Sequence, residues 1–183
     1  MPIEMKVKVL REAGYAEALY GLSLNKNQPI ENMPVLLQKL STHDGGHNKA
    51  LEHIMVWLSV SAPRYWHSEA DTYRISSKNS ESTMHTICKT IANDIERIND
   101  LFEVPLLGDV RGVLIHHAIS GDLLALKQVL PESFIQKRMW MVSYKCLRNI
   151  ILQRRNHRLP HWKMFCESVL DQVEHPELLP TVG

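Results

Sequence analysis

EHIMVWLSVSAP, residues 52–63, has the apolar density and the partial alternation of a buried β-strand. Pro63 ends the strand, because a proline has no backbone N–H to donate to a neighbouring strand. The residues that follow, PRYWHSEADTYR (63–74), are typical of a helix that carries proline in its first turn. The stretch therefore predicts a core strand that passes directly into a helix.

A long polar run comes next, DTYRISSKNSESTMHT (71–86). It contains Arg74, Asn79, Glu81 and His85 among four serines. Such a run can be a solvated loop without a function, or a polar site that faces a ligand. The residues by themselves leave both interpretations open.

The rest of the chain alternates predicted helices and strands. Strands are expected at Met5–Leu10, where apolar and charged side chains alternate, and at Ile135–Val142. We find no repeat, no low-complexity tract and no linker. We therefore expect an α+β protein with a single domain over residues 1–183, in which helix predominates and a mixed sheet is packed with helices. The predicted helices are Tyr15–Leu22, Pro34–Leu40, Ser82–Phe102, Val110–Ala118, Asp122–Val129, Lys145–Gln153 and Pro160–Val173.

The composition is that of an ordinary globular protein, with 44% hydrophobic and 22% charged residues. The net charge of +1 gives no long-range field that would attract nucleic acid or a membrane, so we expect neither as a partner. No apolar run approaches the ~18 residues of a membrane-spanning helix, and the N-terminus lacks the pattern of a secretory signal. Three widely separated cysteines indicate reduced thiols, so we expect a cytoplasmic location, in the host if the chain is viral.

Three histidines surround a pair of glycines, at positions 43, 47 and 53. Their spacing is not that of a helical histidine pair, and no cysteine accompanies them, so we expect no metal. The histidines can instead hydrogen-bond within the turn. A third interpretation is that the Gly45–Gly46 turn brings backbone N–H groups and His47 close to a ligand.

A basic cluster lies between residues 147 and 163. It is explained either by a helix with a solvated outer face, or by a site for an anion or a nucleotide base, because guanidinium matches carboxylate, phosphate and carbonyl oxygens. GxGxxG, GxxxxGK[ST] and GxSxG are absent from the sequence, which argues against a Rossmann or P-loop enzyme. The cationic residues are Arg148, Arg154, Arg155, Arg158 and Lys163.

Taken in order, these segments resemble the flavin-dependent thymidylate synthases, the ThyX family. That family carries the motif R-H-R-x-x-S-x-N-E-x-S-x-R-Y after a strand that begins Glu-His and ends Ala-Pro. Here Glu52-His53 opens the strand and Ala62-Pro63 closes it. The ungapped register then continues through TYRISSKNSESTMH (72–85), and the turn at His47 is similar to the family's Gly-His turn. The matching motif positions are Arg74, Ser77, Asn79 and Ser82.

A second block, residues 129–158, resembles the C-terminal half of the family, where a Leu-Pro precedes a strand and then a helix reading Leu-x-Asn-Phe-Leu-x-x-Arg. Leu147, Asn149 and Arg154 fall on that helix pattern. Lys127 stands where the family has an arginine before Val-Leu-Pro. The chain is most similar to short, divergent members of the kind found in viral genomes, phages included.

Several motif positions differ from the family pattern. Thr72-Tyr73 replaces Arg-His, Ser80 replaces the glutamate, and Met84-His85 replaces the closing Arg-Tyr. Near the C-terminus, residues 159–162 read Leu-Pro-His-Trp where the family has Ala-Gln-x-Glu. These differences favour an alternative hypothesis, in which the chain is a catalytically inactive flavin- or nucleotide-binding or interaction protein of the same fold.

The resemblance implies an enzyme, a transferase for nucleotide biosynthesis that carries a methyl or hydroxymethyl group to C5 of dUMP or a related deoxyuridine nucleotide. FAD would be the cofactor, and NADPH and methylenetetrahydrofolate the co-substrates. A homotetramer is expected, also because a small domain could leave Trp57, Trp66 and Trp140 incompletely buried. Arg154 is expected to hold a pyrimidine carbonyl and to stabilise charge that develops on it during catalysis. The expected flavin-binding residues are Ser23, His47, Arg74, Ser77, Asn79, Ser143, Lys145 and Asn149, and the expected substrate-binding residues are Glu69, Ser82, Thr83, Lys127 and Arg154.

Overall fold

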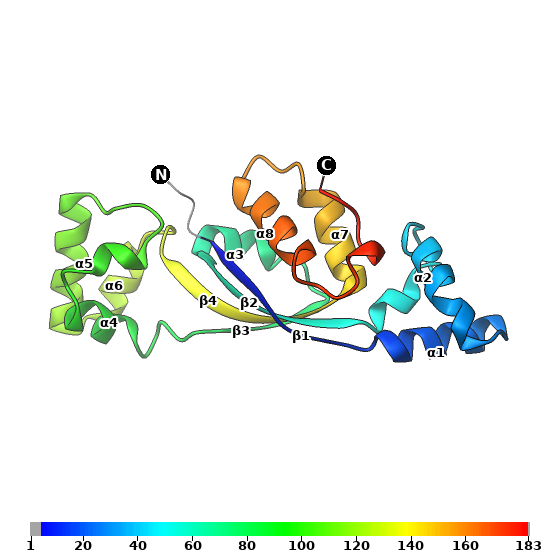
Figure 1. Cartoon of the computed structure of the whole chain (residues 1–183). Coiled ribbons are helices and arrows are strands. Elements are labelled where there is room, and N and C mark those ends of the chain that lie inside the picture. Colours follow the sequence, from blue (N-terminus) through cyan, green and yellow to red (C-terminus); the bar gives the residue numbers. More distant parts are fainter. Residues whose placement is uncertain (1–4, 183) are drawn as a thin grey trace. The chain divides into compact units, whose positions relative to one another are not determined.

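The computed structural model describes residues 5–182 and contains a four-stranded sheet in the order β1-β2-β4-β3 (Figure 1). The expected α+β class is confirmed, with 51% helix. The sheet is antiparallel rather than mixed, because the helices between β1 and β2, and those between β3 and β4, return the chain to the end of the sheet that it left. The strands are β1 (Lys6–Ala13), β2 (Met55–Pro63), β3 (Ser76–Ser80) and β4 (Ile135–Ser143).

Strand β2 is the strand predicted from the opening stretch. Val56, Leu58 and Val60 are fully buried and alternate with half-buried residues, as expected for a strand whose two faces differ. The strand begins at Met55 rather than at Glu52, because Lys49–Glu52 forms a 3-10 turn.

The described residues fall into two compact units. One comprises residues 5–60, 72–79 and 139–182, and we call it the large unit. The other, the small unit, comprises residues 61–71 and 80–138. The single domain expected over residues 1–183 stays a prediction.

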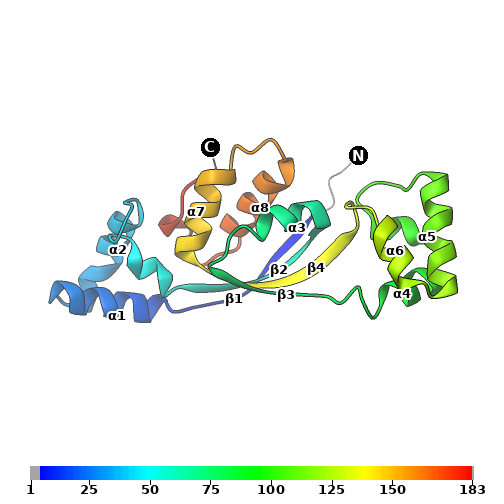
Figure 2. The same ribbon diagram turned by 180° about the vertical axis from the view of Figure 1, so that it is seen from behind.

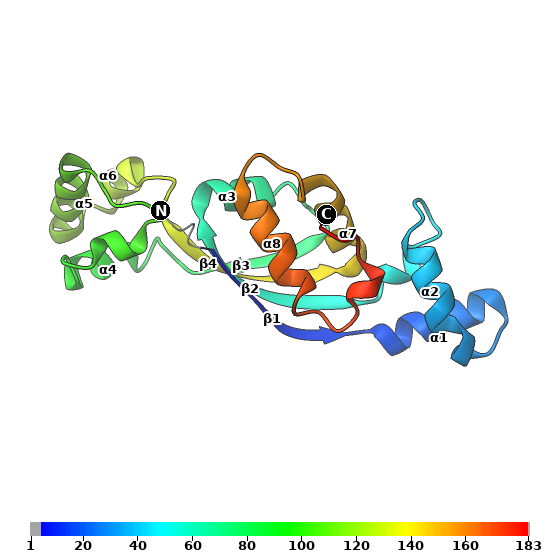
Figure 3. The same cartoon turned by 45° about the horizontal axis from the view of Figure 1, so that its top comes forward.

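In the large unit, helices α7 (Tyr144–Arg154) and α8 (Pro160–Leu170) cover one face of the strands (Figure 3). An aromatic layer fastens α8 to β4: the ring centroids of Trp140 and Phe165 lie 5.7 Å apart, and those of Phe165 and Trp162 lie 6.0 Å apart. All three rings are fully buried. Helices α1 (Tyr15–Lys26) and α2 (Met33–Ser41) lie beyond the end of β1 (Figure 2).

The small unit is helical and has its own core. Helices α4 (Ile87–Asn93), α5 (Gly108–Ser120) and α6 (Leu123–Val129) surround this core, and α3 (Arg64–Ala70) belongs to the same unit. The edge-to-face pair of Phe102 and Phe134, with ring centroids 5.7 Å apart, closes one side. The buried residues of the core are Ile87, Ile91, Ile98, Phe102, Leu114, Ala118, Leu126, Leu130 and Phe134.

Several predicted elements differ in length from the observed ones, two of them in ways that the structure explains or extends. The long helix expected over Ser82–Phe102 is wrong: α4 ends at Asn93, and Ile98–Leu101 forms a separate 3-10 turn. Asp94 ends α4 with φ −144° and ψ 70°, and its carboxylate accepts a hydrogen bond from the backbone N–H of Arg97 at 3.3 Å. Helix α1 is longer than predicted and runs to Lys26.

The tryptophans also correct an expectation. Trp66 and Trp140 are fully buried, so they are not the incompletely buried residues suggested by the sequence. Trp57 is half-buried, and the Arg11 guanidinium lies 5.4 Å from its ring centroid. Within residues 5–182, no helix is both long enough and apolar enough to span a bilayer.

Candidate functional site

A pocket of about 820 Å³ opens in the large unit, where α7 follows β4. Ser143 ends β4 and caps α7, and its hydroxyl accepts a hydrogen bond from the N–H of Cys146 at 3.3 Å. Lys145, Asn149 and Gln153 are spaced four apart on α7, so they share the face that lines the pocket. The loop 72–77 forms another wall. The remaining lining residues are Glu52, Met55, Met141, Ser143 and Cys146.

The pocket wall is part apolar and part polar. Met55, Ile75 and Met141 supply apolar surface. The Lys145 ammonium lies 2.7 Å from a Glu52 carboxylate oxygen. Burial raises the pKa of the Cys146 thiol, partly opposed by the positive charge of Lys78, so this thiol is neutral at pH 7. Such a wall suits a flat ring with polar edges and an anionic group.

The structure brings five of the expected flavin-binding residues to this one pocket. Arg74 and Ser77 come from the loop and the start of β3, while Ser143, Lys145 and Asn149 come from the β4–α7 junction. Asn79 lies two residues after Ser77 on β3, so its side chain is on the same face of the strand. Asn79 is exposed and is not a lining residue.

His47 lines a different pocket, of about 560 Å³, formed by α1, the end of α2 and the 46–53 turn. Lys26 and Lys49 also line it, which gives it a cationic character, and His53 lies on the same wall. Ser23 does not line it: this residue is buried, and its hydroxyl donates to the Tyr20 carbonyl within α1 at 2.7 Å. The two pockets share no lining residue.

The expected substrate residues Thr83 and Lys127 are neighbours in the small unit, although they lie far apart in the sequence. The Lys127 ammonium donates to the Thr83 hydroxyl at 2.6 Å. Burial and, to a smaller extent, repulsion from Arg64 lower the pKa of Lys127. The cluster is therefore electropositive and able to receive a phosphate. Two other expected residues lie in this unit: Ser82 is exposed next to Thr83, and Glu69 is half-buried on α3.

Arg154 is fixed by aromatic neighbours in the large unit. Its Nε donates to the Tyr73 hydroxyl at 2.8 Å, and its Cζ lies 4.8 Å from the ring centroid of the buried Trp162. Arg154 is not among the residues that line the 820 Å³ pocket, whereas Tyr73 is. Tyr73 and Trp162 are two of the positions that differ from the ThyX pattern, and the structure joins both to the same guanidinium.

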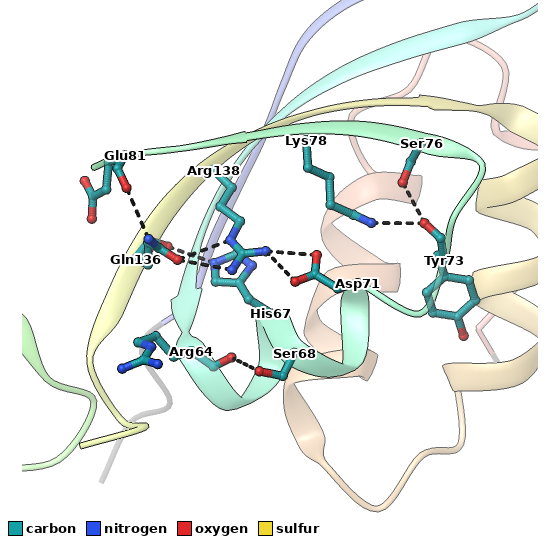
Figure 4. A network of polar contacts seen from close by, with 10 residues as sticks. All are labelled: Arg64, His67, Ser68, Asp71, Tyr73, Ser76, Lys78, Glu81, Gln136 and Arg138. Carbon is teal, nitrogen blue, oxygen red and sulfur yellow. Dashed lines mark hydrogen bonds and ion pairs between the residues drawn. The ribbon is translucent and has the colours of Figure 1, made fainter. Parts of the chain in front are cut away.

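A polar network in the small unit was not predicted from the sequence (Figure 4). The Arg138 Nη1 lies 2.9 Å from each Asp71 carboxylate oxygen, and the Arg138 Nε donates to the Gln136 side chain at 3.2 Å. The buried His67 bonds the Gln136 carbonyl through Nε2 at 2.8 Å. The Gln136 amide in turn donates to the Glu81 carbonyl at 3.2 Å. The network ties α3 to β4.

Sequence reasoning also missed Tyr73, Gln153, Met55 and Met141 as pocket residues. The spacing of Gln153, four positions after Asn149 on a predicted helix, was a signal that could have identified it. A second missed feature lies at the end of β1: metal-ligand atoms of Glu12, Glu174 and His175 lie within 4.8 Å of one another.

Comparison with solved structures shows the same fold in ThyX proteins. A crystal structure of thymidylate synthase X from Helicobacter pylori with FAD and dUMP aligns with a TM-score of 0.79 at 15% identity, over 98% of this chain and 99% of that one. Another structure of flavin-dependent thymidylate synthase ThyX from the same organism, complexed with FAD and dUMP, gives a TM-score of 0.77 at 17% identity, over 95% and 97% of the two chains. No protein-family model matches the sequence. No curated protein matches it either.

Proposed function

We propose that this chain, which has the ThyX fold, is a flavoenzyme that transfers a one-carbon unit to C5 of dUMP or a related deoxyuridine nucleotide. The convergence of Arg74, Ser77, Ser143, Lys145 and Asn149 on one pocket carries the proposal. These residues were selected by their positions in the sequence, and they come from separate segments of the chain. Convergence on a single cavity is expected if they bind one ligand.

The pocket fits a flavin in size and chemistry. A volume of about 820 Å³ lies within the usual range for bound cofactors. Met55, Ile75 and Met141 offer apolar surface for a flat ring, and Asn149 and Ser77 offer neutral hydrogen bonds for its edge. Arg74 supplies positive charge for a phosphate, whereas the charge of Lys145 is balanced by Glu52. A bound flavin would supply the redox and one-carbon chemistry that amino-acid side chains lack.

The residues of the small unit suit the nucleotide. Lys127 and Thr83 form a donor pair for its phosphate, and Arg64, which is paired with Glu132 at 3.2 Å, adds part of its positive charge. NADPH as reductant and methylenetetrahydrofolate as one-carbon donor complete the proposed reaction. We propose that the chain acts as a homotetramer.

A second candidate function is flavin or nucleotide binding without catalysis. Thr72, Ser80 and Met84 stand where the ThyX motif has charged side chains. Charged groups stabilise a transition state more than they stabilise the bound ground state. The loss of three of them therefore lowers catalysis more than it lowers binding.

The test begins with the purified full chain. It is expected to be yellow, or to bind added FAD, and to release the flavin on denaturation. The Asn149→Ala variant should bind flavin about tenfold more weakly because it loses a hydrogen-bonding side chain in the pocket, whereas Asn156→Ala, at an exposed position outside the pocket, serves as the control. A colourless protein that gains no flavin on titration would refute the proposal.

Turnover is measured with dUMP, methylenetetrahydrofolate and NADPH. Chromatography distinguishes a methylated from a hydroxymethylated product. Flavin binding without either product favours the second candidate.

A further inference from the structure

Tyr73 is held in the loop by two hydrogen bonds to its backbone carbonyl. Its carbonyl oxygen accepts hydrogen bonds from the Ser76 hydroxyl at 2.8 Å and from the Lys78 ammonium at 3.0 Å (Figure 4). Arg74 and Ile75 are exposed, and Ile75 retains 82% of its accessible surface. The loop therefore fixes one ring at a defined point of the pocket wall.

Arg154 determines the direction of the Tyr73 hydroxyl proton. Arginine is a hydrogen-bond donor without acceptor capacity, so the phenol oxygen accepts from the Arg154 Nε at 2.8 Å. The Tyr73 hydroxyl then donates its proton to the Gln153 Oε1 at 3.0 Å. The guanidinium lies over the Trp162 ring, with Cζ 4.8 Å from the ring centroid, which restricts its position. The hydrogen bonds thus run in one direction, from Arg154 through Tyr73 to Gln153.

These two hydrogen bonds orient the Gln153 carboxamide. Because Oε1 accepts from Tyr73, Nε2 occupies the other branch of the amide, and within residues 5–182 it has no hydrogen-bond partner. Gln153 lines the pocket. Its amide offers one donor and one acceptor side by side, since Oε1 keeps a second lone pair. That pattern is complementary to a cyclic imide, in which an N–H lies beside a carbonyl.

We propose that Gln153 recognises the imide edge of a planar ring bound in this pocket, and that Tyr73 and Arg154 are positioning residues for it. The inference rests on the proposed function and deepens it. Two ligands of that function share the chemistry: the pyrimidinedione ring of a flavin and the uracil ring of a deoxyuridine nucleotide.

The test compares each ligand with its N3-methyl derivative, which lacks the imide hydrogen. FMN and N3-methyl-FMN are titrated by flavin fluorescence, and dUMP and N3-methyl-dUMP by calorimetry, against the full chain. For one of these pairs the unmodified protein is expected to prefer the N–H form about tenfold, because N3-methylation removes one hydrogen bond with the ligand. In Gln153→Met that preference should fall to about one. Gln128→Met, at an exposed glutamine of the small unit, should keep it.

The preference ratio separates positioning from general weakening of the fold, since a destabilised protein binds both forms more weakly. Tyr73→Phe removes the hydroxyl while the ring remains, so it should lower the ratio without abolishing binding. If Gln153→Met does not fold, the ratio measured for Tyr73→Phe shows whether the preference depends on the hydrogen bond between Tyr73 and Gln153. The pair that shows the preference identifies which ring occupies the subsite.

Three results would overturn the inference. If the unmodified protein shows a preference ratio near one for both pairs, the pocket has no imide subsite, and the proposed function is unaffected. If Gln153→Met keeps the full preference, other residues recognise the imide. The same conclusion follows if Gln153→Met does not fold and Tyr73→Phe keeps the full preference. Binding of neither FMN nor dUMP would refute the proposed function and the subsite together.

Discussion

At the scale of single residues, the neighbours of a side chain decide what its substitution does. Arg154 was expected from the sequence to hold a pyrimidine carbonyl of the ligand. In the structure it stacks on Trp162 and donates to Tyr73. The Arg154 side chain therefore contributes to the packing of α7 against α8 as well as to the candidate site.

Arg154→Lys is expected to lower the free energy of unfolding by about 1–2 kcal/mol, because lysine lacks both the planar face and the Nε donor. Ligand binding in the pocket should weaken as well, through Tyr73. Arg155→Lys is the matched control: Arg155 donates to the Thr181 carbonyl at 2.9 Å at an exposed position, where an ammonium can do the same. Urea unfolding of both variants measures the difference, and equal stabilities would contradict the prediction.

Lys127→Gln should weaken dUMP binding about tenfold or more and leave flavin binding unchanged. The local charge explains the size of the effect: burial and Arg64 lower the pKa of Lys127, and a phosphate would relieve that repulsion. Lys89→Gln, at an exposed position on α4, is the control. Calorimetric titration with dUMP measures both, and similar affinities would place the phosphate elsewhere.

At the scale of elements, short connections decide where helices and strands begin and end. Gly14 joins β1 to α1 with φ 100°, and Asn27 ends α1 with φ 51°. Both residues lie in the left-handed region, where residues with a Cβ are rarely found. Gly14 thus allows β1 to pass directly into α1, and Asn27 ends α1.

Gly14→Ala is expected to destabilise the protein by about 3 kcal/mol or more, because a Cβ would lie 2.0 Å from the His53 carbonyl oxygen and the φ angle is unfavourable. Gly112→Ala in α5 meets no atom within 4 Å and should stabilise by up to about 1 kcal/mol. Thermal unfolding compares the two. If Gly14→Ala were as stable as the unmodified protein, β1 and the 50–54 segment could not be packed as described.

Cys166, buried in α8, should make stability fall at alkaline pH. Burial raises the pKa of its thiol from 9.0 to about 12. Above pH 9 the unfolded chain releases this proton while the folded chain keeps it, so the stabilisation present below pH 9 is lost as pH rises towards 12. Between pH 9 and 11, Cys166→Ala should reduce the downward slope of unfolding free energy against pH by about 1.4 kcal/mol per pH unit. An unchanged slope would contradict the burial of the thiol.

At the scale of the whole molecule, several large apolar side chains are exposed. Leu107 and Leu124 in the small unit retain 77% and 72% of their accessible surface, and Val35 in the large unit retains 77%. The tryptophans that first suggested association are mostly buried. The apolar surface that supports the proposed assembly is therefore mainly aliphatic.

We expect light scattering at micromolar concentration to give four times the 21.1 kDa mass of the chain. Burial of exposed aliphatic surface supplies the free energy, at about 25 cal/mol per Å². Leu124→Glu tests one part of that surface, with Asn93→Glu, which adds the same single negative charge at an exposed position, as the control for charge. A monomeric mass for the unmodified protein would contradict the tetramer.

The sequence by itself determined the α+β class, the buried strand β2, most helices, and a set of residues that proved to meet in one pocket. It could do so because periodicity reports burial directly, and because an ungapped motif register carries the positions of side chains with it. It failed at Ser82–Phe102, where isoleucines at helical spacing belong to one core on both sides of the break at Asp94.

Only the tertiary structure decided which side chains touch. Tyr73 and Trp162 lie about ninety residues apart, and nothing local in the sequence indicates that they share Arg154. The hydrogen bond of Lys127 with Thr83, and the separation of His47 from the other expected flavin residues, depend in the same way on how the chain returns on itself. Local patterns fix the face on which a side chain lies, whereas its partners are fixed by the packing of distant elements.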